Sequence, residues 1–182
     1  MAENIGTPDI SSETFTTRML YKTIRAKFPR VCQLSIEQLK EWLNNSETAD
    51  SILLLDVRET DERSVSFINN SIHILPSKTD LSNVLDKIIN GNKRKIIAYC
   101  SVGYRSSILA QKIYSQLKNT EDFNINDVEI YNLEGSIFKW ANEGNDLVDA
   151  DGKLTKYVHP YNAVWGRFLD ADRRKYPLNH NL

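Results

Sequence analysis

One cysteine of this chain stands where its side chain could become a nucleophile. Cys100 follows the apolar residues 96–99, and Gly103 and Arg105 come within the next five positions. Residues 108–117 then show the apolar spacing of a helix. A thiol between a strand and a helix lies near backbone N–H groups and a fixed positive charge, and both favour the thiolate. Because only about 3% of an ordinary thiol is ionised at pH 7, such surroundings would make Cys100 reactive.

The loop after this cysteine has the composition of an anion-binding site. Gly103 permits backbone conformations closed to other residues, so the N–H groups of residues 101–106 could curl around the sulfur. Arg105 could then present its planar guanidinium to an oxyanion on the substrate. We predict Cys100 as the catalytic nucleophile. The predicted substrate-binding residues are Ser101, Val102, Gly103, Tyr104, Arg105 and Ser106.

An isolated cysteine after an apolar strand is usually a small buried hydrophobic residue. We assign that role to the second cysteine, Cys32. It does not explain why a glycine, an arginine and two serines follow Cys100 immediately before a helix. The catalytic interpretation is therefore preferred for Cys100.

The elements that must position this loop alternate between strand and helix. Apolar runs typical of strands buried on both faces occupy residues 52–55, 96–99 and 128–131. Helical patterns occupy residues 36–43, 81–89 and 108–117, and Ser35 is a plausible N-cap of the first. The alternation predicts an α/β domain with a mainly parallel central sheet. Ligands of such sheets bind beyond the carboxyl ends of the strands, which is where Cys100 lies.

The two ends of the chain differ from this central region. Residues 15–31 carry five basic residues and no acid, with apolar residues at helical spacing. This segment predicts a helix packed on the domain, and a transit peptide or a membrane-surface helix stays open. Residues 151–182 are too aromatic for a solvated linker, so we expect them to pack on the domain or to bind a partner. The predicted division is 1–33, 34–150 and 151–182.

Composition excludes several classes of function. The formal net charge is −1, which argues against nucleic acid as a partner. Two cysteines are too few for a disulfide scaffold, and the three histidines form no ligand cluster, so we expect no metal and no cofactor. No apolar run approaches the roughly 20 residues of a membrane helix, so no stable membrane insertion is expected. A cytoplasmic location is the default, with organellar targeting left open by the basic N-terminal stretch.

Several motifs together resemble the rhodanese (sulfurtransferase) family. Its single-domain members often carry Cys-x-x-Gly-x-Arg-Ser, which residues 100–106 match. Residues 55–59 (Leu-Asp-Val-Arg-Glu) resemble the motif that closes an early strand of the family. Residues 133–140 resemble its late leucine–glycine–tryptophan motif, with Ser136 in place of a second glycine, and residues 34–39 its opening helix. Residues 66–71 depart from the family's Gly-His-Ile-Pro-Gly-Ala segment and keep only the isoleucine, which puts the geometry of that loop in doubt.

The resemblance implies a rhodanese-like domain whose parallel sheet has helices on both faces. It also implies a persulfide mechanism. Cys100 would take a sulfane sulfur from thiosulfate or a thiol persulfide, and a thiol or cyanide would remove it. Arg105 would bind the anionic end of the donor. Asp56 and Arg58 would support the fold near the site, and Trp140 would belong to the core.

Two other classes of function remain as alternatives. Phosphatases and arsenate reductases of related fold have five residues between cysteine and arginine, whereas here there are four. One residue fewer removes about 3.3–3.6 Å of chain, which suits a single sulfur atom better than a phosphate. Many rhodanese-like domains are regulatory or docking modules, and the aromatic tail could bind a protein partner. The retained Cys100 favours an enzyme.

Overall fold

A parallel sheet forms the centre of the molecule. The computed structural model describes residues 14–78 and 80–177. Its main sheet has the strand order β1-β5-β4-β2-β3, and every neighbouring pair is parallel. The strands are β1 (Cys32–Leu34), β2 (Ile52–Asp56), β3 (Ile72–His73), β4 (Lys95–Tyr99) and β5 (Glu129–Leu133). β4 lies in the middle, so its carboxyl end is enclosed by neighbours on both sides.

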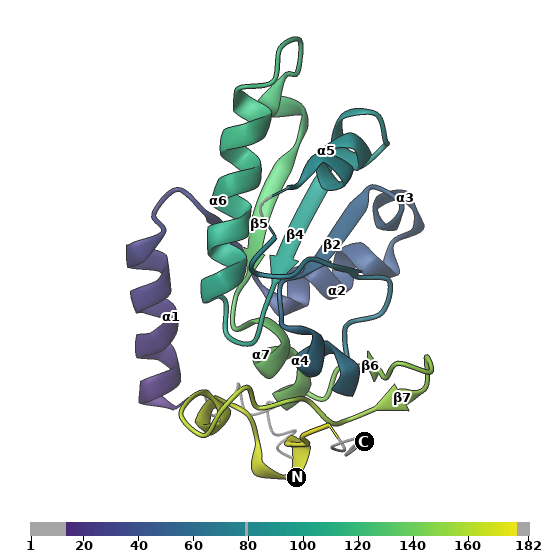
Figure 1. Ribbon diagram of the computed structural model, residues 1–182. Helices are drawn as coiled ribbons and strands as arrows, with labels where there is room; N and C mark the ends of the chain where they lie inside the picture. The colour runs from purple at the N-terminus through teal and green to yellow at the C-terminus, as the bar shows by residue number, and fades with distance from the viewer. Residues whose placement is uncertain (1–13, 79, 178–182) are drawn as a thin grey trace, which may run out of the picture.

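Helices lie on both faces of this sheet (Figure 1). They are α1 (Phe15–Lys27), α2 (Ile36–Asn44), α3 (Ser46–Ala49), α4 (Thr60–Val65), α5 (Ser82–Ile89), α6 (Tyr104–Lys118) and α7 (Ser136–Asn142). A short antiparallel pair, β6 (Leu147–Val148) and β7 (Leu154–Thr155), follows α7. Turns of 3₁₀ helix occupy Ile125–Asp127, Trp165–Phe168 and Ala171–Arg173.

Strand residues alternate between two hydrophobic clusters, one on each face of the sheet. In β4, Ile97 and Tyr99 belong to the cluster that contains buried residues of α2 and α7. Ile96 and Ala98 belong to the cluster that contains buried residues of α5 and α6. The alternation follows from the two-residue period of a strand, and it explains why both faces are apolar. The expected parallel sheet with helices on both faces is confirmed.

Element boundaries differ modestly from the expected ones. The strand expected at residues 128–131 is Glu129–Leu133, and the helix expected from residue 108 begins at Tyr104. Ser35 caps α2 as expected, because its side chain accepts a hydrogen bond from the N–H of Gln38 at 3.1 Å. Trp140 is buried, as expected for a core residue.

The expectation that Cys32 is buried was wrong. Its side chain is exposed. Cys32 opens β1, which lies at the edge of the sheet and pairs only with β5. A residue at the start of an edge strand has a neighbouring strand on one side alone, so a short side chain there can remain in contact with solvent.

Both terminal segments contact the central domain. Ile24 in α1 and Phe28 just after it are buried in the cluster on the α2 side of the sheet. Val158 and Leu169 of the C-terminal segment are buried in the same cluster. Figure 1 shows this yellow segment crossing the bottom of the molecule, below α7 and near the lower end of α1. Within the described ranges, no helix has both the length and the apolarity needed to cross a membrane.

Candidate active site

Cys100 directly follows β4, at the carboxyl end of the central strand. Its side chain is almost fully buried, and the N–H of Gly103 donates to its Sγ at 3.2 Å. Gly103 caps α6 with a φ of 110°, a left-handed conformation that a residue with a Cβ rarely adopts. The glycine therefore lets the chain turn back over the sulfur before the helix begins.

The surroundings of Cys100 favour its thiolate. Burial by itself would raise the pKa of the thiol. The positive charge of Arg105 and hydrogen bonds from Ser106 and Gly103 outweigh this effect, so the pKa lies below its ordinary value. A buried thiol with a lowered pKa is typical of cysteines that act as nucleophiles.

The start of α7 holds the loop from the other side. The N–H groups of Ile137 and Phe138 donate to the carbonyl oxygens of Cys100 and Ser101 at 3.1 and 3.2 Å. The N–H of Cys100 donates to the hydroxyl of Ser136 at 3.2 Å. Ser136 has a φ of 52°, which explains why a glycine is common at this position of the motif. The late motif thus positions the cysteine loop.

Ser106 and Asn132 connect the loop to the sheet. The hydroxyl of Ser106 donates to Asn132 Oδ1 at 2.6 Å, and Asn132 Nδ2 donates to Gln33 Oε1 at 2.7 Å. These bonds join α6, β5 and β1. Ser106 is therefore fixed within the fold, and its backbone N–H helps to lower the pKa of Cys100.

Arg105 pairs with a carboxylate that the sequence did not suggest. Its Nη1 and Nη2 donate to the two carboxylate oxygens of Glu62 at 2.6 and 2.8 Å, and Nη2 also donates to Ser101 Oγ at 2.9 Å. Ser101 Oγ donates to Glu62 Oε1 at 2.5 Å. Burial would raise the pKa of Glu62, but its bonds to Arg105 lower it. The two terminal nitrogens of Arg105, which were expected to bind an oxyanion of the substrate, are thus already bonded to Glu62.

Glu62 lies in the first turn of α4 and forms a capping box with Glu59. The N–H of Glu59 donates to Glu62 Oε2 at 3.0 Å. A glutamate three residues after a helix N-cap was a visible signal for the helix start. Its role at the site depends on how α4 packs against the loop, which no local pattern specifies.

Asp56 and Arg58 form a buried ion pair beside the site, away from the sulfur. Both side chains have no exposed surface, and Arg58 Nε and Nη2 donate to the two oxygens of Asp56 at 2.8 and 2.7 Å. Burial would raise the pKa of Asp56, but Arg58 and Arg63 lower it. Tyr99 donates to Asp56 Oδ2 at 3.0 Å, so the pair is joined to β4.

Residues 66–71, which depart from the family pattern, are held by this network. The carbonyl of Ser66 accepts from Arg58 Nη2 at 2.6 Å, and the N–H of Ile68 donates to the hydroxyl of Tyr99 at 3.1 Å. Arg63 Nη2 donates to the carbonyl of Ser71 at 2.9 Å. Side chains of the central domain therefore fix this loop without the usual glycines and proline.

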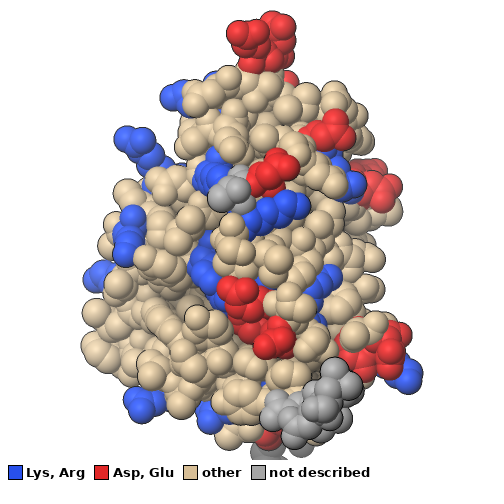
Figure 2. Space-filling model, viewed as in Figure 1, with Lys and Arg blue, Asp and Glu red and all other residues tan. Residues whose placement is uncertain are grey.

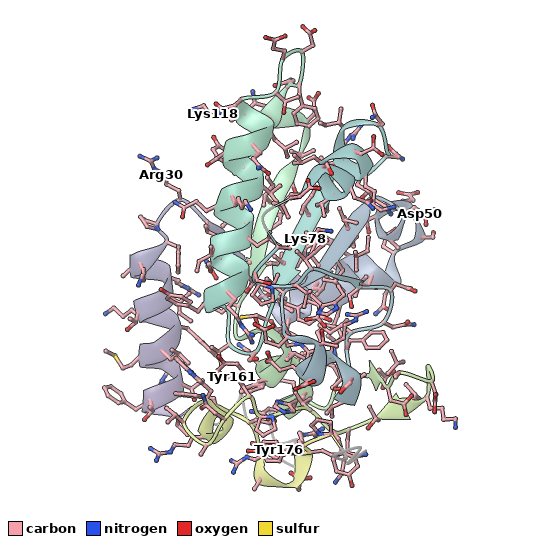
Figure 3. All side chains as sticks on the ribbon, in the orientation of Figure 1. Arg30, Asp50, Lys78, Lys118, Tyr161 and Tyr176 are labelled. Atoms are coloured by element: carbon pink, nitrogen blue, oxygen red, sulfur yellow. The ribbon has the colours of Figure 1, made fainter. Side chains whose placement is uncertain are left out.

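A cavity of about 140 Å³ opens over the sulfur. Its walls include Ser101, Val102, Tyr104 and Arg105 from the loop, together with Tyr161 and Trp165 from the C-terminal segment. Figure 3 shows Tyr161 just below the lower end of α6, where the loop lies. The sequence placed these two aromatic residues in a packing or partner-binding tail, because residues so distant in the chain carry no local sign of meeting Cys100.

The charges near the site are mixed. Figure 2 shows blue and red side chains interspersed over the face that contains the start of α6. Such a surface provides little long-range attraction for a highly charged macromolecule. Among the described residues, no group of three histidine, cysteine, aspartate or glutamate side chains could hold a metal ion.

Comparisons with solved structures show the same fold at low identity. A thiosulfate sulfurtransferase from Pseudomonas aeruginosa matches with a TM-score of 0.54 and 17% identity, over 75% of this chain and 23% of that one. This chain therefore spans less than a quarter of that protein. An As-Sb reductase from Leishmania major matches with a TM-score of 0.57 and 18% identity, over 69% of this chain and 92% of that one. These matches establish the fold alone.

Sequence comparison adds the family. No curated protein sequence matches the chain significantly. A family model described as a rhodanese-like domain matches residues 35–143, which is more than half of the chain. The matched region includes the loop of Cys100, the ion pair of Asp56 and Arg58 and the motif at the start of α7. With this match and the observed sheet, the chain belongs to the rhodanese-like domain family.

Proposed function

We propose that the protein is a sulfurtransferase that carries a sulfane sulfur on Cys100. The observation that carries the proposal is the hydrogen bond from the Gly103 N–H to Cys100 Sγ, inside a loop with four residues between cysteine and arginine. We expect a loop of this length to hold one additional sulfur atom close to its backbone donors. The lowered pKa of Cys100 supports a thiolate nucleophile.

The first half of the cycle loads the sulfur. The Cys100 thiolate attacks the outer sulfur of thiosulfate or of a thiol persulfide, and a new S–S bond forms. The original S–S bond breaks, and sulfite or a thiolate leaves with the electron pair. Loop N–H groups would stabilise the negative charge on the resulting persulfide, as donors in an oxyanion hole do.

The second half of the cycle removes the sulfane sulfur from Cys100. A thiolate or cyanide attacks the outer sulfur of the persulfide, and Cys100 leaves as a thiolate. The products are a new persulfide or thiocyanate, and no metal or organic cofactor is needed. Ser101, Val102, Tyr104 and Arg105 would contact the donor, because they line the cavity over the sulfur.

Mass spectrometry of the intact protein tests this function. After incubation with thiosulfate or glutathione persulfide, the wild type should gain the mass of one sulfur atom, and cyanide should remove it. Cys100→Ser should gain nothing, whereas Cys32→Ser should behave as the wild type does. An unmodified wild type that hydrolyses a generic aryl phosphate would instead indicate a phosphatase.

A further inference from the structure

The cavity over Cys100 is completed by residues outside the region that matches the family model. That region ends at residue 143, whereas Tyr161 and Trp165 come from the C-terminal segment. Tyr161 and Trp165 therefore give the cavity properties that are specific to this chain and that family membership does not imply.

The turn that carries both aromatic residues is firmly built. Tyr161 has a φ of 64°, and its N–H donates to His159 Nδ1 at 3.0 Å. The side-chain oxygen of Asn162 accepts from the N–H of Trp165 at 3.0 Å. His159 is buried, and burial lowers the pKa of its ring, which keeps Nδ1 available as an acceptor.

The segment is also anchored to the domain on its far side. Asn142, the last residue of α7, donates to the carbonyl of Phe168 at 3.0 Å and accepts from the N–H of Asp170 at 3.0 Å. Leu169 between them is almost fully buried in the core. The wall therefore has a defined position relative to Cys100, because its supports lie on both sides of the turn.

The N-terminal segment supports the part of the wall that Tyr104 forms. Tyr104 packs edge-on against Phe28 with ring centroids 5.4 Å apart, and Lys27 Nζ lies 4.9 Å from the centre of its ring. Val102, between Cys100 and Gly103, adds a buried aliphatic surface. Aromatic and aliphatic groups of the loop and of the C-terminal segment thus line the cavity over the sulfur, and the N-terminal segment supports Tyr104 from behind.

The charge at this cavity is largely compensated. Both terminal nitrogens of Arg105 donate to Glu62, and its guanidinium carbon lies 4.8 Å from the centre of the Tyr161 ring. An arginine bonded at its edge and covered on its face has less capacity for a doubly charged donor. An apolar cavity of about 150 Å³ binds benzene, and the volume here is about 140 Å³.

We propose that Tyr161 and Trp165 make this site selective for sulfur donors whose sulfane sulfur is carried on an aromatic or similarly apolar group. The inference rests on the proposed sulfur transfer at Cys100 and names the class of donor. The apolar group of the donor would contact the two aromatic rings, and the sulfane sulfur would lie next to Cys100. Thiosulfate, a small dianion, has no group that could use these walls.

Two thiosulfonates isolate the contribution of the apolar group. Benzenethiosulfonate and methanethiosulfonate share one reactive group and one negative charge. In either case the Cys100 thiolate bonds to the terminal sulfur, the S–S bond of the donor breaks, and the sulfinate leaves with the electron pair. The ratio of their kcat/KM values, with cyanide as acceptor, is divided by the ratio of their rates with free glutathione. This correction removes the difference in intrinsic reactivity.

For the wild type, the corrected ratio of kcat/KM should favour benzenethiosulfonate by about tenfold or more, because burial of its aromatic ring against the cavity walls stabilises the bound donor. Tyr161→Ala and Trp165→Ala should each reduce the ratio several-fold, and Trp165→Phe should reduce it less. Tyr157→Ala is the matched control, because Tyr157 is an aromatic residue of the same segment outside the cavity walls, and it should keep the ratio. Circular dichroism would verify that each variant is folded.

The possible failures are distinguishable. A wild type that acquires sulfur from none of the donors would contradict sulfur transfer itself. A wild type that acquires it with a corrected ratio near one would overturn the selectivity alone. A high ratio that survives both alanine substitutions would show that other residues bind the ring.

Discussion

At Cys100, several neighbours act on one sulfur atom. Burial opposes the thiolate, and Arg105 together with the Gly103 N–H favours it. Glu62 acts through Arg105, because a carboxylate bonded to the guanidinium compensates part of its positive charge. The reactivity of the thiol thus depends on a balance between the positive charge of Arg105 and the negative charge of Glu62. Removing the first charge should raise the pKa of Cys100, and removing the second should lower it.

We expect Cys100 to remain reactive at lower pH than an ordinary cysteine, whose pKa is about 8.5. The rate of alkylation by iodoacetamide, measured against pH in a Cys32→Ser background, would give the midpoint. Arg105→Met should move the midpoint up and slow the reaction at pH 7 on the order of tenfold, because the charge that stabilises the thiolate is lost. Glu62→Gln should move it down, because the positive charge of Arg105 is then uncompensated. Midpoints that do not respond to either substitution would contradict this balance.

At the scale of elements, the turn between β4 and α6 determines where the thiol lies. Gly103 combines a φ of 110° with a close neighbour, since an added Cβ would lie 3.0 Å from Asn132 Nδ2. Gly152, in the turn between β6 and β7, has a φ of 76° and no neighbour within 4 Å. These two glycines separate the cost of the backbone conformation from the cost of crowding the loop.

Gly152→Ala should lower the free energy of unfolding by about 1–2 kcal/mol, the cost of a left-handed conformation. Gly103→Ala should lower the free energy of unfolding further, because the loop must shift away from Asn132. It should also slow alkylation of Cys100, because the same shift moves the N–H of residue 103 away from the sulfur. Urea denaturation and alkylation rates would provide both values. Equal losses of stability, with Cys100 reactivity unchanged, would show that the loop tolerates the methyl group.

The sequence predicted the elements that depend on local pattern. The apolar run at residues 96–99 indicated a buried strand, and the glycine and arginine after Cys100 indicated the loop. Glu62 was not found, because a carboxylate in a helix start gives no sign of the arginine that it meets more than 40 positions later. Tyr161 and Trp165 looked like packing residues, because their approach to Cys100 depends on how the tail crosses the domain. Cys32 was misassigned because an edge strand and a central strand have similar short patterns.

At the scale of the whole molecule, Asp56 connects parts of the fold that are distant in the chain. Its carboxylate accepts hydrogen bonds from Arg58, Arg63 and Tyr99, and these residues in turn hold the loop at residues 66–71. Asp56 thereby links β2, α4 and β4. This network takes the place of the glycine-rich segment that the family usually has there, so its loss should destabilise the entire domain.

Asp56→Asn should lower the free energy of unfolding by about 3–5 kcal/mol at pH 7, because it leaves the buried Arg58 without its counter-charge. The pKa of Asp56 is lowered in the folded state, so its contribution is complete above the pKa of the unfolded chain, about 3.9, and is lost as the pH falls toward the folded value. The difference between wild type and variant should therefore be constant from pH 7 to about 5 and should shrink below about pH 4. Urea denaturation across this range would measure it, with the exposed Asp61→Asn in α4 as a control that changes stability by at most about 1 kcal/mol. A difference that stays constant down to pH 3 would mean that folding does not lower the pKa of Asp56. A loss of less than about 1 kcal/mol at pH 7 would mean that the network is dispensable for the fold.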